Sequence, residues 1–236
     1  MKNPSELIVR LQDGAAAGAT TTALVYAAGA PVLGATLILG HGAGAGQRSA
    51  FMVDFASALS ALGLDVVTFN FLYTEQRRRI PDRAPALEAC YRDVIAAVRK
   101  AVPSANRALF VGGKSMGGRI ATQIAAADRE LPIAGLVLLG YPLHPPGRPD
   151  QRRDKHLAAI CRPMLIVQGE RDAFGLPADL RPIVEKLEPP PTLEVIAKGD
   201  HSFKLPRKDP AGQNAVYSNI QSAIANWIAK HLKARA

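Results

Sequence analysis

Short apolar runs and amphipathic stretches alternate along most of the chain. Runs bounded by turn residues are typical of buried strands, whereas apolar residues spaced three and four apart are typical of helices. The apolar runs predict strands over 5–11, 20–28, 36–40, 65–71, 107–112, 133–140, 163–168 and 192–197. The helical spacing predicts helices over 49–62, 86–101, 116–127, 178–187 and 213–233.

Strands that alternate with helices in this way are typical of an α/β fold, in which helices cover both faces of a mostly parallel sheet. No Pro- or Ser-rich linker interrupts the alternation, so we expect residues 1–236 to form a single domain. The longest connections without strong periodicity are 72–85 and 141–162. Long loops at the ends of a sheet are where function tends to lie.

The composition is that of a soluble globular protein, with 48% apolar and 21% charged residues. The first ten residues lack the apolar segment of a secretory signal, and no apolar run approaches the length of a membrane span. We therefore expect a cytoplasmic protein without a membrane partner. Cys90 and Cys161 are predicted to be small buried side chains in a reducing compartment.

The net charge of +9 raises the question of a partner. Arginines cluster within 77–83 and basic residues cluster again within 148–155. A basic face can bind nucleic acid or attract an anionic substrate. However, no helix-turn-helix, zinc-finger or aromatic RNA-binding signature is present, so we expect no nucleic acid partner. The two clusters predict either a solvated surface or a surface that attracts an anionic substrate.

The motif that carries chemistry is G-x-S-x-G, at residues 113–117. A predicted strand runs directly into it and a predicted helix runs directly out of it, which is the context of a nucleophile elbow. This sharp turn strains the central residue, Ser115, and needs glycines where the two backbones pass closely. The same residues resemble the end of a phosphate-binding loop, but position 108, where that motif needs glycine, is alanine.

A serine hydroxyl needs a base to take its proton. His201 follows the last predicted strand, so it lies at the same edge of the sheet as Ser115. His144, between prolines, is a second histidine that the pattern allows near the site, whereas we expect His156 and His231 to lie at the surface.

The base in turn needs an acid to fix its tautomer. Asp172 follows the strand at 163–168 and is the predicted acid, with Glu170 as the alternative. The order Ser115, Asp172, His201 along the chain is the order of the triad in α/β hydrolases.

Acyl transfer also needs N–H donors for the oxyanion that develops on the substrate. The first predicted donor is the N–H of Met116. The second is expected from the glycine-rich loop 40–46, where Ala43 is the first choice and Gly42 the next. That loop loosely fits a dinucleotide-binding pattern, but the next strand does not end in the acidic residue that such a site needs.

The chain resembles the α/β-hydrolase superfamily, and in detail its dienelactone-hydrolase-like branch. The resemblance rests on the HGAGAG loop, the Phe69-Asn70-Phe71 strand end and the GGKSMGGR elbow. These motifs are also similar to a small bacterial family and to the hydrolase-like domain of a chromatin-complex subunit. The resemblance implies an eight-stranded sheet and a serine-dependent hydrolase. Dienelactone hydrolases use a cysteine nucleophile, so Ser115 argues against their substrate.

These observations predict a serine hydrolase that acts on a small carboxylic ester or thioester, and they leave open whether the substrate is neutral or anionic. Connection 141–162 leaves room for a short helix but for no large lid. The alternatives are a serine peptidase or acyltransferase with the same triad, and a catalytically silent interaction module. Predicted substrate-binding residues are His41, Asn70, Arg78 and His144. No metal-binding motif is visible, so we expect no cofactor. The sequence carries no signal for the oligomeric state.

Overall fold

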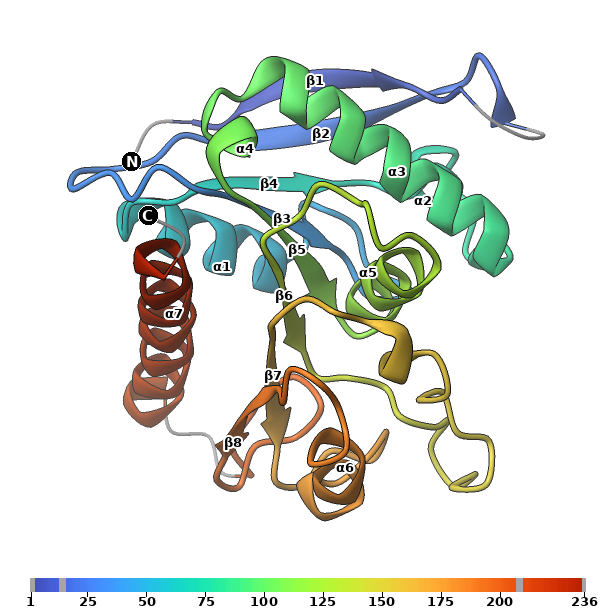
Figure 1. The fold of residues 1–236 in the computed structure, drawn as a ribbon, viewed down its shortest axis with the longest axis vertical. Helices are drawn as coiled ribbons and strands as arrows, with labels where there is room; N and C mark the ends of the chain where they lie inside the picture. The colour runs from blue at the N-terminus through green and yellow to red at the C-terminus, as the bar shows by residue number, and fades with distance from the viewer. Residues whose placement is uncertain (1–2, 13–15, 207–209, 235–236) are drawn as a thin grey trace.

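The computed structural model describes residues 3–12, 16–206 and 210–234, whose strands form one eight-stranded sheet (Figure 1). The strands are β1 (Ser5–Arg10), β2 (Thr20–Tyr26), β3 (Thr36–Gly40), β4 (Asp65–Phe69), β5 (Leu109–Lys114), β6 (Gly135–Leu139), β7 (Met164–Gly169) and β8 (Thr192–Ile196). Their order in the sheet is β1-β2-β4-β3-β5-β6-β7-β8. The pairs β1–β2 and β2–β4 are antiparallel and the remaining pairs are parallel, which confirms the predicted fold class.

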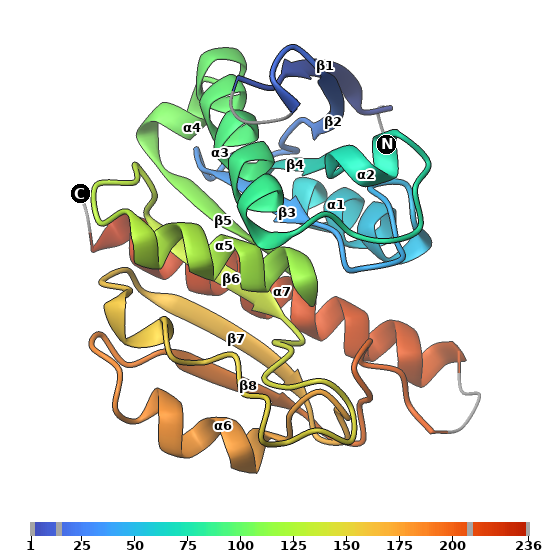
Figure 2. The same ribbon diagram turned by 90° about the vertical axis from the view of Figure 1, so that its right-hand side faces the viewer.

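Helices cover both faces of the sheet, as Figures 1 and 2 show. They are α1 (Ala50–Ala61), α2 (Leu72–Glu75), α3 (Ala84–Ala101), α4 (Ser104–Arg107), α5 (Met116–Ala127), α6 (Pro177–Val184) and α7 (Pro210–Lys233), with a 3₁₀ turn at Leu157–Ala159. Helices α1 and α7 pack on one face, and α3 and α5 pack on the other. Each face therefore has its own hydrophobic core.

The central strands supply side chains to both cores. In β3, Ile38 belongs to the core under α3 and α5, whereas its neighbours Leu37 and Leu39 belong to the core under α1 and α7. In β5, Val111 and Phe110 divide in the same way. All five side chains are fully buried. Alternate side chains of a strand point to opposite faces, so a central strand buried on both faces reads as a continuous apolar run.

The predicted strand 36–40 and the predicted helix 116–127 have the observed bounds, and the other predicted elements differ by a few residues at their ends. Strand β5 extends to Lys114 because Gly112 and Gly113 still pair with β3 and β6. Helices α2 and α4 were not predicted, since four residues show no periodicity. Cys90 is buried as expected, but Cys161 is exposed, so that prediction is wrong.

Connection 141–162 contains the 3₁₀ turn at Leu157–Ala159 and otherwise irregular backbone. The predicted absence of a large lid is therefore confirmed. Among the described residues, no helix is long and apolar enough to cross a membrane.

Candidate active site

Ser115 is the single residue between β5 and α5. Its φ of 51° and ψ of −113° are strained for a non-glycine residue. Its N–H donates a hydrogen bond of 2.9 Å to the carbonyl of Leu139 in the neighbouring strand. A Cβ at Gly113 or at Gly117 would lie 2.2 Å from the carbonyl oxygen of Gly40. The motif therefore needs its glycines because β3 passes directly against the turn.

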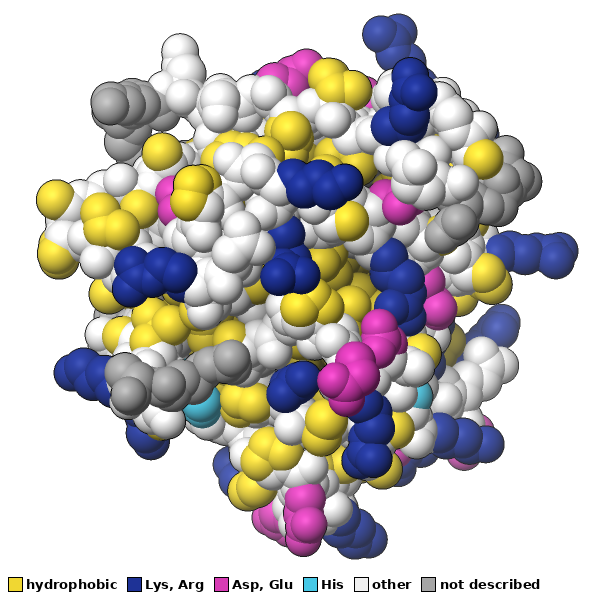
Figure 3. Space-filling model, turned by 45° about the horizontal axis from the view of Figure 1, so that its top comes forward, with side chains coloured by type: hydrophobic (Ala, Val, Ile, Leu, Met, Phe, Trp, Pro, Cys, Tyr) yellow, Lys and Arg dark blue, Asp and Glu magenta, His cyan; other side chains and the backbone are white. Residues whose placement is uncertain are grey.

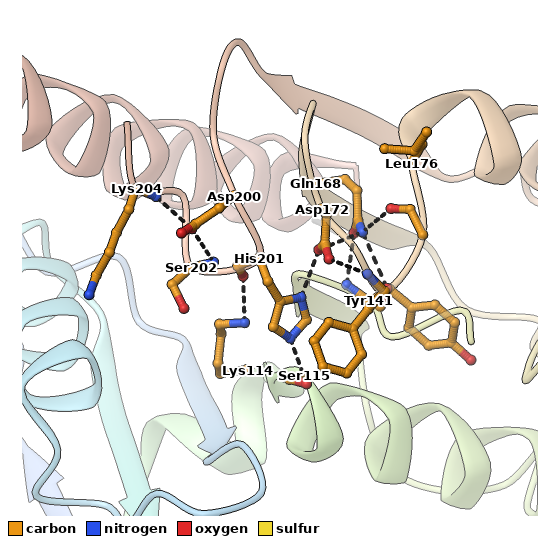
Figure 4. A network of polar contacts seen from close by, with 12 residues as sticks. Lys114, Ser115, Tyr141, Gln168, Asp172, Leu176, Asp200, His201, Ser202 and Lys204 are labelled. Carbon is orange, nitrogen blue, oxygen red and sulfur yellow. Dashed lines mark hydrogen bonds and ion pairs between the residues drawn. The ribbon is translucent and has the colours of Figure 1, made fainter. Parts of the chain in front are cut away.

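Three polar side chains form a hydrogen-bonded chain above the carboxyl ends of the strands (Figure 4). Nε2 of His201 lies 2.8 Å from Oγ of Ser115, and Nδ1 of His201 lies 2.7 Å from Oδ2 of Asp172. A carboxylate only accepts hydrogen bonds, so Nδ1 carries the proton and Nε2 is free to accept from the serine hydroxyl. Ser115, His201 and Asp172 come from three separate connections, which follow β5, β8 and β7.

The carboxylate of Asp172 is 1% exposed and is held by further donors. Oδ1 accepts from the N–H of Phe174 at 2.8 Å, and Oδ2 accepts from Nε2 of Gln168 at 2.9 Å. Glu170, the alternative acid, is exposed and accepts from the N–H of Lys198 instead. Gln168 was not predicted, although it is the one polar side chain in the buried strand β7.

Lys114, the residue before Ser115, is buried beside the histidine. Its Nζ donates a hydrogen bond of 2.6 Å to the carbonyl of His201, as Figure 4 shows. Burial lowers the pKa of Lys114 to about 8, while the carboxylates of Asp172 and Asp200 act in the opposite direction. Lys114 was not predicted as a site residue, because G-x-S-x-G leaves this position open to any residue.

A pocket of about 320 Å³ opens at Ser115 and His201. Apolar side chains of Phe51, Met52 and Phe174 form much of its wall. The ring of Phe174 stacks on the imidazole of His201 at 4.1 Å between centroids. This stacking and the two hydrogen bonds of the ring limit its rotation.

The loop after β3 forms another wall of this pocket. Gly42 and Ala43 both line it with Ser115. The N–H of Ala43 has no hydrogen-bond partner among the described residues. Met116 is the first residue of α5, so its N–H has no acceptor within the helix. Two predicted N–H groups therefore lie at the site without a competing partner.

His41 was predicted to bind substrate, and the structure gives it a different place. The side chain is completely buried. Nε2 accepts from the N–H of Phe71 at 3.1 Å, so Nδ1 donates to the carbonyl of Gly42 at 2.8 Å. Burial lowers the pKa of His41, which favours this neutral form. His41 holds the loop in place and does not reach the pocket.

His144 does not line the pocket with Ser115 either. It is half-buried, and its Nδ1 lies 2.9 Å from the carbonyl of Pro145. Two further histidines were wrongly placed at the surface. His156 is half-buried with Nε2 at 2.8 Å from Oγ1 of Thr122, and the ring of His231 packs on Trp227.

Asn70 and Arg78 lie beside a second hollow next to this pocket. Oδ1 of Asn70 accepts from the N–H of Gln47 at 2.9 Å, and Nδ2 donates to Glu75 at 2.8 Å. Arg78 forms an ion pair of 2.7 Å with Asp82. A role of either residue in binding substrate stays a prediction. In the described part of the chain, no group of three or more His, Cys, Asp or Glu side chains could hold a metal ion.

Comparison with known proteins agrees with this architecture. Residues 34–229 match the family model described as an alpha/beta hydrolase domain. Among solved structures, the chain is similar to XC6422 from Xanthomonas campestris, described as an a/b serine hydrolase without lid. The two are 22% identical over 96% of each chain, with a TM-score of 0.73.

Two further solved structures share the fold. One is dienelactone hydrolase from Anabaena variabilis, 18% identical over 94% of this chain and 97% of that one, with a TM-score of 0.68. The other is Est1E from Butyrivibrio proteoclasticus with bound ferulic acid, 13% identical over 93% of this chain and 99% of that one, with a TM-score of 0.69. With its family model matched over most of its length, the chain belongs to the alpha/beta hydrolase family.

Proposed function

We propose that the protein hydrolyses a small carboxylic ester or thioester through an acyl-enzyme on Ser115. The observation that carries this proposal is the continuous hydrogen-bonded chain from Oγ of Ser115 through His201 to Asp172. Each of its contacts is within the range expected for a nucleophile, its base and the acid that orients the base.

In the proposed reaction, Oγ of Ser115 attacks the carbonyl carbon while Nε2 of His201 takes the hydroxyl proton. The negative charge then lies on the former carbonyl oxygen, where the N–H groups of Met116 and Ala43 would stabilise it, with Gly42 as the next candidate donor. His201 gives its proton to the departing alcohol or thiol as the tetrahedral intermediate collapses. A water molecule attacks the acyl-enzyme in the same way and releases the acid.

The size and chemistry of the pocket support a small substrate. About 320 Å³ is at the lower end of ligand pockets, and no large lid extends it for a long acyl chain. The apolar wall at Phe51, Met52 and Phe174 suits a short alkyl or aromatic group. The ferulic acid in Est1E shows that a protein of this fold binds a small aromatic acid. A peptidase or an acyltransferase would use the same serine, so substrates must separate these activities.

The test is intact-mass analysis after treatment with a fluorophosphonate. We expect one adduct on the wild-type protein, none on Ser115→Ala and much slower labelling of His201→Ala. Ser202→Ala is a matched control because Ser202 lines the same pocket, and it should label like the wild type. A panel of nitrophenyl esters, thioesters and amides then identifies the class of substrate. Folded wild-type protein that forms no adduct would contradict the proposal and favour a catalytically silent member of the fold.

A further inference from the structure

A second hollow of about 780 Å³ adjoins the pocket at Ser115. It lies between the turn at 44–49 and the segment 70–79, and we call it the arginine groove. Ala45 and Ser49 line both the groove and the pocket. The two spaces are therefore neighbours, and a group attached to a substrate at Ser115 has the groove beside it.

Four arginines line this groove: Arg48, Arg77, Arg78 and Arg79. No Asp or Glu is among its described lining residues. Arg78 is paired with Asp82, and Arg48 makes a 3.3 Å contact with Glu6 in which both side chains are more than half exposed. Arg77 and Arg79 form no ion pair with any described residue. The groove thus carries positive charge that the protein leaves uncompensated.

The backbone at Arg77 is a second observation. Arg77 follows α2 with a φ of 57°, and the N–H groups of Arg77 and Arg78 donate to the carbonyls of Thr74 and Tyr73. This is the Schellman arrangement, in which the left-handed residue is usually glycine. An arginine there accepts strain that glycine would avoid. We therefore expect the Arg77 side chain to have a role in the groove that outweighs the strain of its backbone.

The wall of the groove also contains unpaired hydroxyl groups. Tyr73 is 1% exposed and lines the groove, and its hydroxyl has no hydrogen-bond partner among the described residues. The hydroxyl of Thr74, in the same wall, is likewise buried without a partner there. Buried polar groups are normally satisfied, so two of them in one wall indicate a place for a polar ligand.

The second basic cluster differs from the arginine groove. Arg152 donates two hydrogen bonds to Asp154, at 2.7 and 3.3 Å, and neither Arg152 nor Arg153 lines the pocket or the groove. Figure 3 shows Lys and Arg side chains spread over one face of the molecule, with fewer acidic ones among them. Basic side chains therefore occur across this face of the molecule. The groove differs because it places arginines next to the pocket at Ser115.

We infer that the arginine groove binds a carboxylate or phosphate group of the ester substrate. Both groups offer the paired oxygens that a guanidinium binds through two parallel hydrogen bonds. The inference rests on the proposed function, because it assigns a charged part to the same substrate. It also selects residues 77–79 over 152–153 as the residues that attract an anion.

Three fluorophosphonates test this inference, with one short linker that ends in a methyl ester, a carboxylate or a phosphate. The measurement is the second-order rate of adduct formation at Ser115 by intact mass. We expect the wild type to react about 10-fold faster with at least one anionic probe than with the neutral probe at about 20 mM salt. This advantage should shrink at about 200 mM salt because salt screens exposed charges.

Variants then locate the effect. The double variant Arg77→Asn, Arg79→Gln should lose the advantage and keep the rate with the neutral probe within about twofold. Asparagine is chosen at position 77 because it tolerates positive φ. Arg79→Glu should reverse the preference toward the neutral probe. The double variant Arg148→Gln, Lys155→Gln, at two exposed residues of the other cluster, also removes two positive charges and should behave like the wild type.

The outcomes separate the two proposals. Equal rates with all three probes, or an advantage that the double variant keeps, would overturn the groove inference and leave the hydrolase proposal in place. An advantage that the variant Arg148→Gln, Lys155→Gln loses equally would assign the effect to the net charge and also overturn the inference. Wild-type protein that reacts with no probe would overturn the proposed function, and the groove inference with it.

Discussion

Nε2 of Gln168 donates a hydrogen bond of 2.9 Å to Oδ2 of Asp172, the oxygen that also contacts Nδ1 of His201. Oε1 of Gln168 accepts from the N–H of Tyr141 at 2.8 Å. The amide therefore connects β7 to the loop after β6 and fixes one end of the hydrogen-bonded chain. Gln168 acts on Ser115 only through other residues, so it is a positioning residue.

Gln168→Leu should weaken both the site and the fold. The N–H of Tyr141 would lose its partner in the interior, which costs about 1–3 kcal/mol of the free energy of unfolding. The rate of fluorophosphonate labelling should fall about 10-fold because Asp172 loses a donor. Gln221→Leu, at another buried glutamine on α7, should lower the melting temperature without slowing the labelling. Unchanged labelling of Gln168→Leu would contradict a positioning role.

Asp172→Asn tests the acid directly. An asparagine amide can donate to Nδ1 of His201 and so favour the tautomer in which Nε2 carries the proton, which cannot accept from Ser115. We expect kcat/KM for an ester to fall by about 10⁴-fold. Glu170→Gln is the matched control, since Glu170 is exposed and contacts the backbone of Lys198, and it should retain activity. A large loss in Glu170→Gln with a small one in Asp172→Asn would reverse the assignment.

Loss of the proton from Lys114 should lower the reaction rate at alkaline pH. Burial lowers the pKa of Lys114 to about 8, so the amine loses its charge as the pH rises through that value. The charged form makes the stronger hydrogen bond to the carbonyl of His201. The labelling rate should therefore decline above about pH 8, and Lys114→Met should be slower and lack this decline. Lys204→Met, at an exposed lysine nearby, should keep the wild-type profile.

Lys114 should also shape the pH dependence of stability. Its pKa in the folded protein lies below the usual 10.5, so between about pH 8 and 10.5 the unfolded chain binds more protons at this group. The contribution of Lys114 to the free energy of unfolding therefore rises with pH across that window. In urea titrations at several pH values, Lys114→Met should lack this rise. An equal rise in both proteins would contradict the burial of a charged lysine.

Gly117→Ala should destabilise the fold through a contact with the backbone. The new Cβ would lie 2.2 Å from the carbonyl oxygen of Gly40, and neither strand nor helix can shift freely. We expect a loss of about 2–3 kcal/mol in the free energy of unfolding. Gly44→Ala is the control, because φ there is 73° but nothing lies within 4 Å of the new Cβ, whereas Gly117 is helical and has the contact without a positive φ. Gly44→Ala should cost about 1 kcal/mol from backbone strain alone. Similar losses in both variants would contradict the contact with Gly40.

Periodicity predicted the strands and long helices because burial on one or both faces leaves a repeating pattern. It could not reveal α2, whose four residues are too few to repeat. Ser115, Asp172 and His201 could be proposed because topology places the ends of parallel strands at one edge. Topology does not give contacts, so the sequence alone could not show the distances between them.

Other parts of the site depend on packing that a sequence does not display. Phe174 was not predicted as a site residue, because nothing in the sequence indicates that its ring stacks on His201. His41 stands in the glycine-rich loop and suggested a ligand contact, but its ring turns inward to the N–H of Phe71. A polar side chain next to a motif can bind the substrate or hold the loop in place, and only the structure distinguishes these two roles.

Strand β8 stands at the border of the sheet, with β7 as its single neighbour, and none of its residues is buried. The chain that leaves this strand carries His201. Local opening at such a border needs less free energy than global unfolding. On heating, the rate of fluorophosphonate labelling at Ser115 should therefore fall before the helices unfold. This fall should occur at a lower temperature than the loss of the far-UV circular dichroism signal. His201 is thus attached to a strand that a single neighbour holds in the sheet.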